Sequence, residues 1–405
     1  MQSHVARYVG CGCRGFAHGL MTLEELVRLK HLNDVFYRCS VISHWKESTQ
    51  RYRMNLLLNN LTLRNEVLNG TYRISKTIDF QLNERGKTRD IHAPTIRDRV
   101  LQKVVVQHIL IPYLTKPLIY DNYASLKRRG TSFARKRFEI MLHRYMTKHG
   151  TEGYILQIDI RKYFDSIDHG ILKQMLRERI HEPPEIMRLI DYLIDTSSET
   201  DKGLNLGAEA PQIFAIYYLS FLDSWLKVVK GVKYYGRYMD DMFILSDSKE
   251  ELKSLLAEIR TRLSRLKLAI NKKKTHIVRL RHGFTFLQIK YNLTEERRII
   301  KRPTRAKIVR ERRRLKRFRG LCDAGRMKEY DVLNCYKSWR QSVLTDCNAC
   351  QTTIKSMDTL FRTLFPCVPE SKRQSRDRVI SSVFKEAHYE DLQYQRSGTH
   401  RTPGL

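Results

Sequence analysis

The sequence predicts an α+β fold, in which helices alternate with an antiparallel sheet, and three observations lead to this class. Residues 154–160 form a short apolar run with Asp159 near its end, as a central strand does when it delivers a carboxylate to a sheet edge. Two β-prone runs, at 232–235 and 242–245, flank a bend at 236–241, which is typical of a hairpin. Segments with helical spacing lie around these strands, so strand, helix and hairpin alternate.

The first part of the chain is predicted to be helical, followed by a hairpin. Within residues 22–68, Thr22-x-x-Glu25 is a capping box. The later apolar series that suits a packed helical hairpin comprises Leu56, Leu57, Leu61 and Leu63. Asn69-Gly70 breaks this pattern, and residues 72–91 are predicted to form a protruding, strand-rich basic hairpin with a turn at 84–87. The alternating residues before that turn are Ile74, Ile78, Phe80 and Leu82.

Helical spacing recurs three times further along the chain. Residues 96–114 are predicted to form a buried helix that is ended by Pro112 and Pro117. A second helix is expected at about 171–179, after the first strand. Ser248-x-x-Glu251 caps a third helix, whose apolar stripe comprises Leu252, Leu255, Leu256, Ile259, Leu263 and Leu266.

The last hundred residues differ in character from the rest. Residues 305–319 have Arg or Lys at most positions. A solvated helix face is the ordinary interpretation of such a run, but its density and the charge of the whole chain favour a helix that grips nucleic acid. A further helical region is predicted at 331–364. After Pro366 the tail is polar, and we expect partial disorder or a docking segment.

The charge of the chain implies a polyanionic partner. The sequence has 75 Lys and Arg against 43 Asp and Glu, a formal net charge of +32. Nucleic acid is the favoured partner because basic grooves gain affinity by releasing counterions from phosphates. Anionic membrane surfaces and ribosome-type assemblies remain alternatives at this point.

The chain has no run of about eighteen apolar residues that could span a bilayer. Its N-terminal twenty residues are broken by His, Arg and Gly, which is unlike the apolar stretch of a secretory signal. We therefore expect no membrane association and a cytoplasmic location. The eight cysteines include two close pairs, Cys11-Gly-Cys13 and Cys347-Asn-Ala-Cys350, but neither pair has a well-spaced partner pair. We predict reduced structural thiols and no zinc.

Two adjacent carboxylates, Asp240 and Asp241, lie at the predicted hairpin bend. Acids are common in turns, so turn chemistry alone is the ordinary interpretation. Here, however, the pair lies between apolar strands and follows a second strand that ends near Asp159. If those strands are neighbours, three carboxylates converge, and this is a ligand set for two Mg²⁺ ions about 3.5 to 4 Å apart.

The residues around these acids resemble the motifs of reverse transcriptases. Tyr238-Met239-Asp240-Asp241 looks like their YxDD signature, and the stretch from Asp159 to Phe164 looks like their first aspartate motif. From about residue 65 to 364 the chain is similar to bacterial retroelement enzymes. The further segments that carry this resemblance are Lys87-Thr-Arg89, Arg97-Asp98-Arg99, Tyr123-Ala-Ser, Arg129-Gly130, Asn271, Lys274-Thr275 and Phe284-Thr-Phe286-Leu287.

The resemblance implies an RNA-directed DNA polymerase with a right-hand fold: fingers, a palm of antiparallel sheet plus helices, and a helical thumb. The expected organisation is an N-terminal helical extension at 1–70, fingers at 71–150, palm with part of the fingers at 151–298, a basic helical thumb at 299–366, and a polar tail at 367–405. The expected cofactors are two Mg²⁺ ions, with Mn²⁺ as a substitute. The expected partners are an RNA template and a DNA or RNA primer.

The resemblance also assigns roles to individual residues. Asp159, Asp240 and Asp241 would be the catalytic metal ligands, and Phe164 would lie under the sugar of the incoming nucleotide, although core packing is an alternative. The other residues expected near the nucleotide are Ile160, Lys87, Arg89, Leu206, Gly207, Gln212, Tyr238 and Lys274, of which Lys274 could equally be a plain surface lysine. Template or primer contacts are expected from Arg97, Arg99, Arg129, Arg310 and Arg313, and Arg97 and Arg99 could instead support the fold.

One motif departs from the commonest pattern. Where group II intron and retroviral enzymes have Gln-Gly, this chain has Leu206-Gly207, followed by Pro211-Gln212. This resembles diversity-generating retroelement enzymes, which implies mutagenic cDNA synthesis with a small basic accessory protein, but Pro211 departs even from them. Gln288 after Leu287 also departs from the expected Gly and puts the primer-grip geometry in doubt. An antiphage defence reverse transcriptase and a catalytically silent RNA-binding protein with the same fold are the alternatives.

Overall fold

The computed structural model describes residues 20–84 and 87–366. The chain divides into two compact units, residues 1–304 and 305–405. The first nineteen residues of the expected extension at 1–70, and the whole of the expected tail at 367–405, lie outside the described residues. In the part of the chain that is described, no helix is both long enough and apolar enough to cross a membrane.

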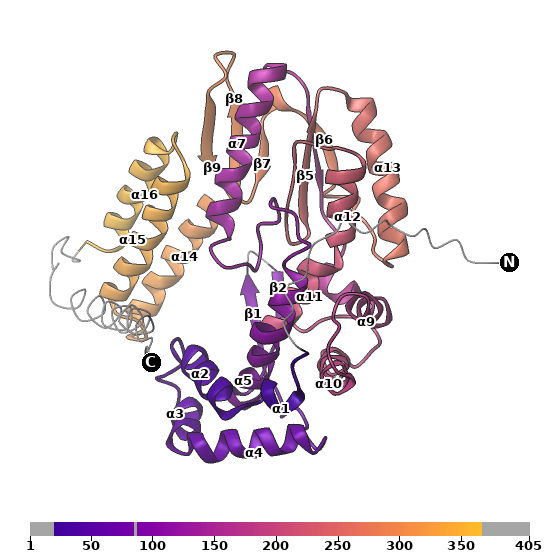
Figure 1. The fold of residues 1–405 in the computed structure, drawn as a ribbon. Coiled ribbons are helices and arrows are strands. Elements are labelled where there is room, and N and C mark those ends of the chain that lie inside the picture. The colour runs from indigo at the N-terminus through magenta and orange to yellow at the C-terminus, as the bar shows by residue number, and fades with distance from the viewer. Residues whose placement is uncertain (1–19, 85–86, 367–405) are drawn as a thin grey trace, which may run out of the picture. The chain divides into compact units, whose positions relative to one another are not determined.

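The described part of the first unit begins with four helices, α1 (Leu23–Leu26), α2 (Leu29–Ser40), α3 (Glu47–Met54) and α4 (Leu56–Leu68) (Figure 1). The predicted capping box is confirmed, because the Thr22 hydroxyl accepts from the Glu25 amide and the Glu25 carboxylate accepts from the Thr22 amide. The hairpin follows as β1 (Ile78–Glu84) and β2 (Lys87–Ala93), paired antiparallel. Ile74 lies outside β1, because its amide donates to the Tyr192 hydroxyl instead of to a neighbouring strand.

The predicted helix at 96–114 is present in three connected pieces. These are α5 (Ile96–Val105), a π turn η1 (Val106–Leu110) and α6 (Ile111–Leu114). Pro112 lies in the first turn of α6 and does not end the helix, contrary to the prediction. The π turn contains His108, four residues before this proline, where a regular helix would bring a carbonyl against the proline ring and lose a hydrogen bond. The long helix α7 (Thr131–His149) follows.

The central sheet has four antiparallel strands in the order β4-β5-β3-β6. They are β3 (Tyr154–Ile158), β4 (Tyr235–Tyr238), β5 (Asp241–Ser246) and β6 (His276–Arg279). A separate three-stranded antiparallel sheet, in the order β7-β8-β9, comprises β7 (Phe284–Phe286), β8 (Ile289–Leu293) and β9 (Ile299–Pro303). The predicted α+β class with antiparallel sheet is confirmed.

The predicted hairpin is present, but its bend is shorter than expected. Tyr238 pairs with Asp241, so the connection between β4 and β5 is only Met239-Asp240, and Gly236 to Tyr238 belong to the strand. Two features that a propensity pattern cannot show extend the strand. A Cβ at Gly236 would lie 2.3 Å from the Tyr123 hydroxyl, so only glycine allows this close packing, and the Arg237 side chain is completely buried.

Helices cover both faces of the central sheet. Between β3 and β4 lie α8 (Tyr163–Ser166), α9 (His169–Arg177), α10 (Pro184–Asp195), α11 (Glu209–Tyr218), α12 (Ser220–Ser224) and the π turn η2 (Trp225–Val229). Helix α13 (Lys249–Arg265) follows β5, and the 3-10 turn η3 (Leu280–His282) follows β6. Leu156 and Ile244 on one face of the sheet share the main core with α11 and α13. The other face meets α7, where the Phe138 ring lies 4.7 Å from that of Phe243 (Figure 1).

In the second unit, residues 305–366 are described and form three helices, α14 (Arg305–Asp323), α15 (Glu329–Asp346) and α16 (Gln351–Leu364). The expected start of a basic helical region at 299 coincides with β9, and the basic helix itself begins at Arg305. Leu315 and Phe318 of α14 are buried, and the rings of Tyr336 and Phe361 stack at 4.5 Å between α15 and α16. The Trp339 side chain is buried, as expected for a core residue rather than a stacking platform.

Candidate active site

The sheet register brings the three predicted carboxylates to one edge. Ile158 of β3 pairs with Met242 of β5, so Asp159, directly after Ile158, and Asp241, directly before Met242, are neighbours across the two strands. Asp240 lies in the two-residue turn beside them. Asp159 is buried, Asp240 is half-buried and Asp241 is exposed, so the group lies where the core meets solvent.

Two side chains from the loop before β6 hold Asp159. The Lys274 ammonium lies 2.5 Å from Asp159 Oδ1, and the Asn271 amide donates to Asp159 Oδ2 at 2.8 Å. Burial works to lower the pKa of Lys274, but the hydrogen bond to Asp159 and the charges of all three aspartates outweigh it and raise this pKa. Lys274 is therefore not the plain surface lysine that the sequence left open.

Negative charge accumulates at Asp240. Burial raises the pKa of its carboxyl group, and the neighbouring charge of Asp159 raises it further, while Lys274 and Arg89 oppose the shift. Such a concentration of carboxylate charge favours binding of a cation. In the described residues, no three acidic, His or Cys side chains are close enough to hold a metal as they stand. Each oxygen of Asp159 accepts one hydrogen bond, from Lys274 or from Asn271, and keeps further lone pairs that could face an ion. The oxygen donors themselves fit Mg²⁺ or Mn²⁺.

A cavity of about 500 Å³ opens beside the carboxylates within the first unit. Its lining includes Asp159, Asp241 and Lys274, together with Phe284 and Thr285 of β7 and Leu287, which follows β7. The Gln157 amide donates to the Thr285 carbonyl at 2.6 Å and ties the two sheets together here. The cavity therefore connects the carboxylates to the segment where Gln288 departs from the expected glycine.

The two residues that follow Asp159 in the first motif are placed differently. Ile160 is almost fully buried and forms a β-bridge with Ile270, so its side chain belongs to the core. Phe164 is half-buried on α8, with its ring 5.8 Å from that of Tyr163. Phe164 thus retains an accessible edge, whereas Ile160 can approach a ligand only through its backbone.

The Leu206-Gly207 motif packs against the hairpin. The His92 amide of β2 donates to the Leu206 carbonyl at 3.2 Å. Gly207 has φ +129°, and a Cβ there would lie 3.1 Å from the His92 carbonyl oxygen, so a side chain would be strained by both conformation and contact. Gln212 on α11 is exposed and accepts from the Ser125 hydroxyl at 3.0 Å. Tyr238, the strand partner of Asp241, is half-buried.

The hairpin carries the two expected triphosphate ligands on β2. Arg89 is exposed, and its positive charge works to lower the pKa of the Asp240 carboxyl group, against the larger effect of burial. Lys87 begins β2 opposite Glu84, and its side chain lies outside the described residues. The hairpin strand β2 therefore links the motif at Leu206 to the carboxylate edge.

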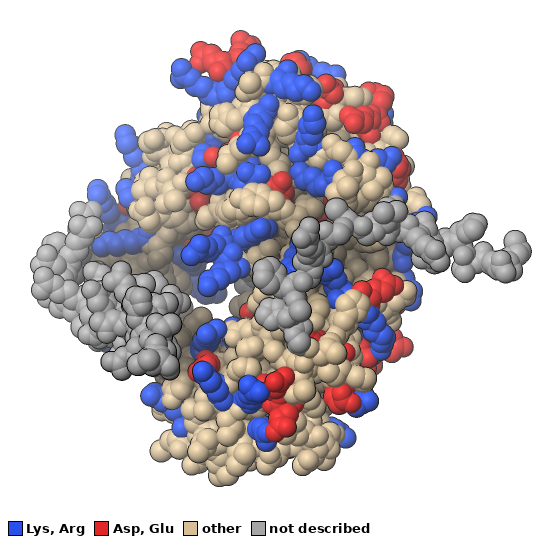
Figure 2. Space-filling view, viewed as in Figure 1, with Lys and Arg blue, Asp and Glu red and all other residues tan. Residues whose placement is uncertain are grey.

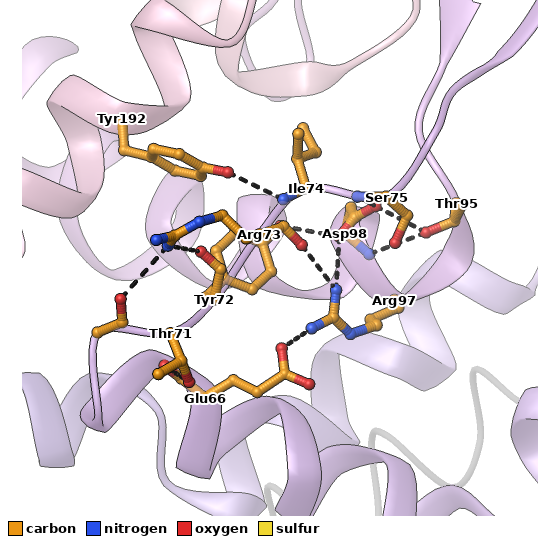
Figure 3. A network of polar contacts seen from close by, with 11 residues as sticks. Glu66, Thr71, Tyr72, Arg73, Ile74, Ser75, Thr95, Arg97, Asp98 and Tyr192 are labelled. Carbon is orange, nitrogen blue, oxygen red and sulfur yellow. Dashed lines mark hydrogen bonds and ion pairs between the residues drawn. The ribbon is translucent and has the colours of Figure 1, made fainter.

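Three of the arginines expected to contact nucleic acid have protein partners. Arg97 forms ion pairs with Glu66 and Asp98 and donates to the Arg73 carbonyl at 3.1 Å (Figure 3). Arg99 donates to the Cys39 carbonyl at 3.3 Å. Arg129 donates to the carbonyl oxygens of Tyr120 and Asn122 at 2.9 Å and 2.6 Å. These contacts give all three arginines a role in holding the fold.

The basic helix α14 presents its cations to solvent. Arg310 and Arg313 are both exposed, and so are Arg305, Arg312, Lys316 and Arg317 on the same helix. Lys and Arg also outnumber Asp and Glu over the face of the molecule that Figure 2 shows. The exposed cations of α14 suit a phosphate backbone, because such a backbone is bound by many cations at once.

Sequence reasoning missed a buried ion pair behind the turn that carries Asp240. Arg237 and Asp223 are both completely buried, and the Arg237 Nε lies 2.9 Å from Asp223 Oδ1. The sequence signals are Asp223 as a single charge in the apolar segment around Leu222, and Arg237 within a β-prone segment around Tyr235. Buried charges are almost always paired, so these two residues could have been matched on that ground.

Comparison with known proteins identifies the family. The family model described as reverse transcriptase (RNA-dependent DNA polymerase) matches residues 75–291, which is more than half of the 405-residue chain. The chain therefore belongs to the reverse transcriptase family, and the predicted right-hand polymerase class is confirmed. It is similar to Protein YkfC of Escherichia coli (strain K12), with 23% identity over 266 residues, 56% of this chain and 69% of that protein.

Two solved structures are also similar. Apo telomerase from Candida tropicalis aligns with TM-score 0.43 and 14% identity, over 56% of this chain and 49% of that one. Telomerase from Candida albicans in complex with a TWJ fragment of telomeric RNA aligns with TM-score 0.45 and 13% identity, over 80% of this chain and 59% of that one. The alignments thus span about half to three fifths of those telomerase chains.

Proposed function

We propose that this chain is an RNA-directed DNA polymerase that extends a DNA or RNA primer with deoxynucleotides. The observation that carries the proposal is the placement of Asp159, Asp240 and Asp241 at one edge of the central sheet, inside the segment that matches the family. Two divalent ions, Mg²⁺ with Mn²⁺ as a substitute, would be held by these three carboxylates. When bound, they lower the pKa of the primer 3′-hydroxyl and stabilise charge on the triphosphate.

The surrounding residues take supporting roles in this proposal. Lys274, already close to all three aspartates, neutralises carboxylate charge before ions bind and contacts the pyrophosphate side of the nucleotide afterwards. Arg89 and Lys87 reach the triphosphate from the hairpin. The half-buried Phe164 lies under the nucleotide sugar and selects against a 2′-hydroxyl. These are the contacts that orient the substrate for in-line attack.

The two units take the roles of a polymerase hand. We assign residues 71–150 to the fingers, 151–298 to the palm and 299–366 to the thumb, with 1–70 as a helical extension. Exposed cations of α14, among them Arg310 and Arg313, then grip the backbone of the template–primer duplex. Arg97, Arg99 and Arg129 act by holding the fold, because each already bonds to protein groups.

For the biological role, we propose a bacterial or phage retroelement that makes mutagenic cDNA with a small basic accessory protein. Leu206 supports this role, because an apolar side chain there removes an amide that could bond to the incoming nucleotide and primer. Fidelity is tested by sequencing cDNA made by the wild type and by Leu206→Gln. The proposal predicts errors concentrated at template adenines in the wild type and fewer in the variant. Equal, low error rates at adenines in both proteins contradict it.

The polymerase proposal is tested by primer extension on a defined RNA template with Mg²⁺ and four deoxynucleotides. The matched control is Asp240→Ala, with Glu199→Ala as a variant that removes an exposed acid elsewhere. We expect metal-dependent cDNA from the wild type and from Glu199→Ala, and none from Asp240→Ala. Template binding without extension, in either metal and with candidate partners added, would instead favour the catalytically silent RNA-binding protein.

A further inference from the structure

A fully buried ion pair lies directly behind the turn that carries Asp240. Arg237 of β4 and Asp223 of α12 are both 0% exposed. The guanidinium meets the carboxylate with two nitrogens, Nε at 2.9 Å from Oδ1 and Nη2 at 2.5 Å from Oδ2. Replacing such a pair by apolar residues of similar volume often leaves the stability of a protein unchanged. Its presence in the core is therefore better explained by what the arginine holds in place.

The remaining donors of Arg237 connect two parts of the candidate site. Nη1 donates to the Met239 carbonyl at 3.1 Å, which is the peptide group leading into Asp240. Nη2 donates to the Ile216 carbonyl at 2.9 Å, near the end of α11. Helix α11 begins just after Leu206-Gly207. One rigid guanidinium thus ties the carboxylate turn to the helix that follows the nucleotide motif.

The turn needs such support because its backbone is strained. Met239 has φ +54°, a left-handed conformation that is unfavourable for a residue with a side chain. Strained residues persist where surrounding contacts fix them. The Arg237 bond to the Met239 carbonyl fixes the orientation of this peptide group, and therefore the direction in which the Asp240 side chain leaves the turn.

Further hydrogen bonds fix Arg237 and Asp223 in place and connect them to neighbouring segments. The Tyr235 hydroxyl donates to Asp223 at 2.5 Å, so the carboxylate is fixed from a second side. The backbone of Arg237 bonds to the loop before α7 through the Asp121 carbonyl at 3.0 Å and the Tyr123 amide at 2.9 Å. The Tyr163 hydroxyl donates to the Ala215 carbonyl, adjacent to Ile216, and Tyr163 precedes Phe164.

We propose that Arg237, held by Asp223, is a positioning residue that sets the geometry of the Asp240 turn relative to α11 and the nucleotide pocket. The inference rests on the proposed polymerase function. Arg237 does not touch the substrate; it acts through the Met239 carbonyl. Its loss is expected to reduce turnover and ion binding while leaving template binding unchanged.

Arg237→Lys tests the inference, because lysine keeps the charge next to Asp223 but cannot present separate nitrogens to Met239 and Ile216. The matched control is Arg340→Lys, since Arg340 forms another two-nitrogen pair, with Asp358 at 3.0 Å and 3.2 Å. We expect kcat to fall about 10²-fold in Arg237→Lys, because a small misplacement of reacting groups reduces the rate by about this factor. The dissociation constant for template–primer should change less than about twofold, and Arg340→Lys should match the wild type in both.

A second variant separates positioning from folding. Asp223→Leu combined with Arg237→Met replaces the pair by apolar side chains of similar volume, which buried sites often accept without loss of stability. Here the Tyr235 hydroxyl and the Met239 and Ile216 carbonyls also lose a partner, so we expect a lower Tm but a folded protein at about 25 °C. In that folded protein we expect a kcat as low as in Arg237→Lys and faster hydrogen exchange in the peptide spanning 236–242. A wild-type kcat in either correctly folded variant overturns the inference.

Two readouts without catalysis keep this inference distinguishable from the polymerase proposal. Binding of Mn²⁺ alone, followed by electron paramagnetic resonance, should weaken about tenfold in Arg237→Lys and stay unchanged in Arg340→Lys. If the wild type extends no primer, the proposed function fails, and hydrogen exchange with Mn²⁺ binding still decides the role of Arg237. Unchanged exchange and unchanged Mn²⁺ affinity in both Arg237 variants overturn it.

Discussion

Replacing Asp98 by alanine is expected to destabilise the first unit strongly and to loosen the base of the hairpin. Asp98 is completely buried at the start of α5 and accepts from four groups (Figure 3). These are the Tyr72 hydroxyl at 2.8 Å, the Ser75 amide at 3.0 Å, the Thr95 hydroxyl at 2.8 Å and Arg97 Nη1 at 3.3 Å. The carboxylate thus joins the segment that leads into β1 to the helix that follows β2.

The expected loss of stability in Asp98→Ala follows from the number of these donors and from the burial of the carboxylate. Each hydrogen bond to a charged group is worth about 1.5–3 kcal/mol, but such bonds share one carboxylate and are not additive. Removing one partner of a buried charge pair costs about 3–5 kcal/mol, and we adopt this range for Asp98→Ala. Domains of this kind are stable by about 5–15 kcal/mol, so the change removes a large part of that stability. Asp98→Asn keeps the shape and one acceptor, so it should cost less.

Urea denaturation followed by tryptophan fluorescence measures the free energy of unfolding. Glu199→Ala removes an exposed acid from the same unit and serves as the control, with an expected change below about 0.5 kcal/mol. Where Asp98→Asn still folds, we expect a raised KM for deoxynucleotides, since the hairpin carrying Arg89 loses an anchor. An Asp98→Ala protein as stable as Glu199→Ala would refute the reasoning.

Three further predictions concern single positions. Gly207→Ala should lower stability by about 1–3 kcal/mol and raise KM, because φ +129° and a contact of 3.1 Å with the His92 carbonyl both oppose a side chain; thermal unfolding and nucleotide titrations measure this. Gln288→Gly should raise stability by about 1 kcal/mol, since φ +67° favours glycine, and an unchanged Tm would contradict this. Burial raises the pKa of Glu311 despite the nearby Arg314. At a pH above this raised pKa, Glu311 is ionised in the folded protein and destabilises the fold. At a pH below the pKa of Glu311 in the unfolded chain, the destabilisation is absent because the group is protonated in both states. Glu311→Gln should therefore raise Tm at pH 8, with a gain that vanishes towards pH 4; a constant gain at all pH values would show that charge is not the cause.

Features that depend on local sequence could be predicted. The apolar run before Asp159 and the paired acids at the bend indicate where two strands end. They do so because strand length and turn type depend on only a few consecutive residues. The capping box at Thr22 is likewise a contact between residues three apart. These local signals were enough to place the three carboxylates on strands and a turn.

Features that depend on distant partners could not be predicted. Arg97 and Arg129 look like free cations in the sequence, but their partners, Glu66 and the Tyr120 carbonyl, are brought close only by tertiary folding. The same holds for Arg237, whose ion pair with Asp223 joins two elements that are separate in the sequence, β4 and α12. Periodicity shows which face of an element is apolar, but not which buried charge will find a partner there.

The central claim is that Asp159, Asp240 and Asp241 carry metal-dependent nucleotide addition. It is tested most directly by single-turnover incorporation of one deoxynucleotide into a primer on an RNA template, with Mg²⁺, in the wild type and in the three single Asp→Asn variants. We expect rapid incorporation by the wild type and a rate at least about 10³-fold lower in each variant, with unchanged template–primer affinity. Incorporation by any of the three variants within about tenfold of the wild type would contradict it.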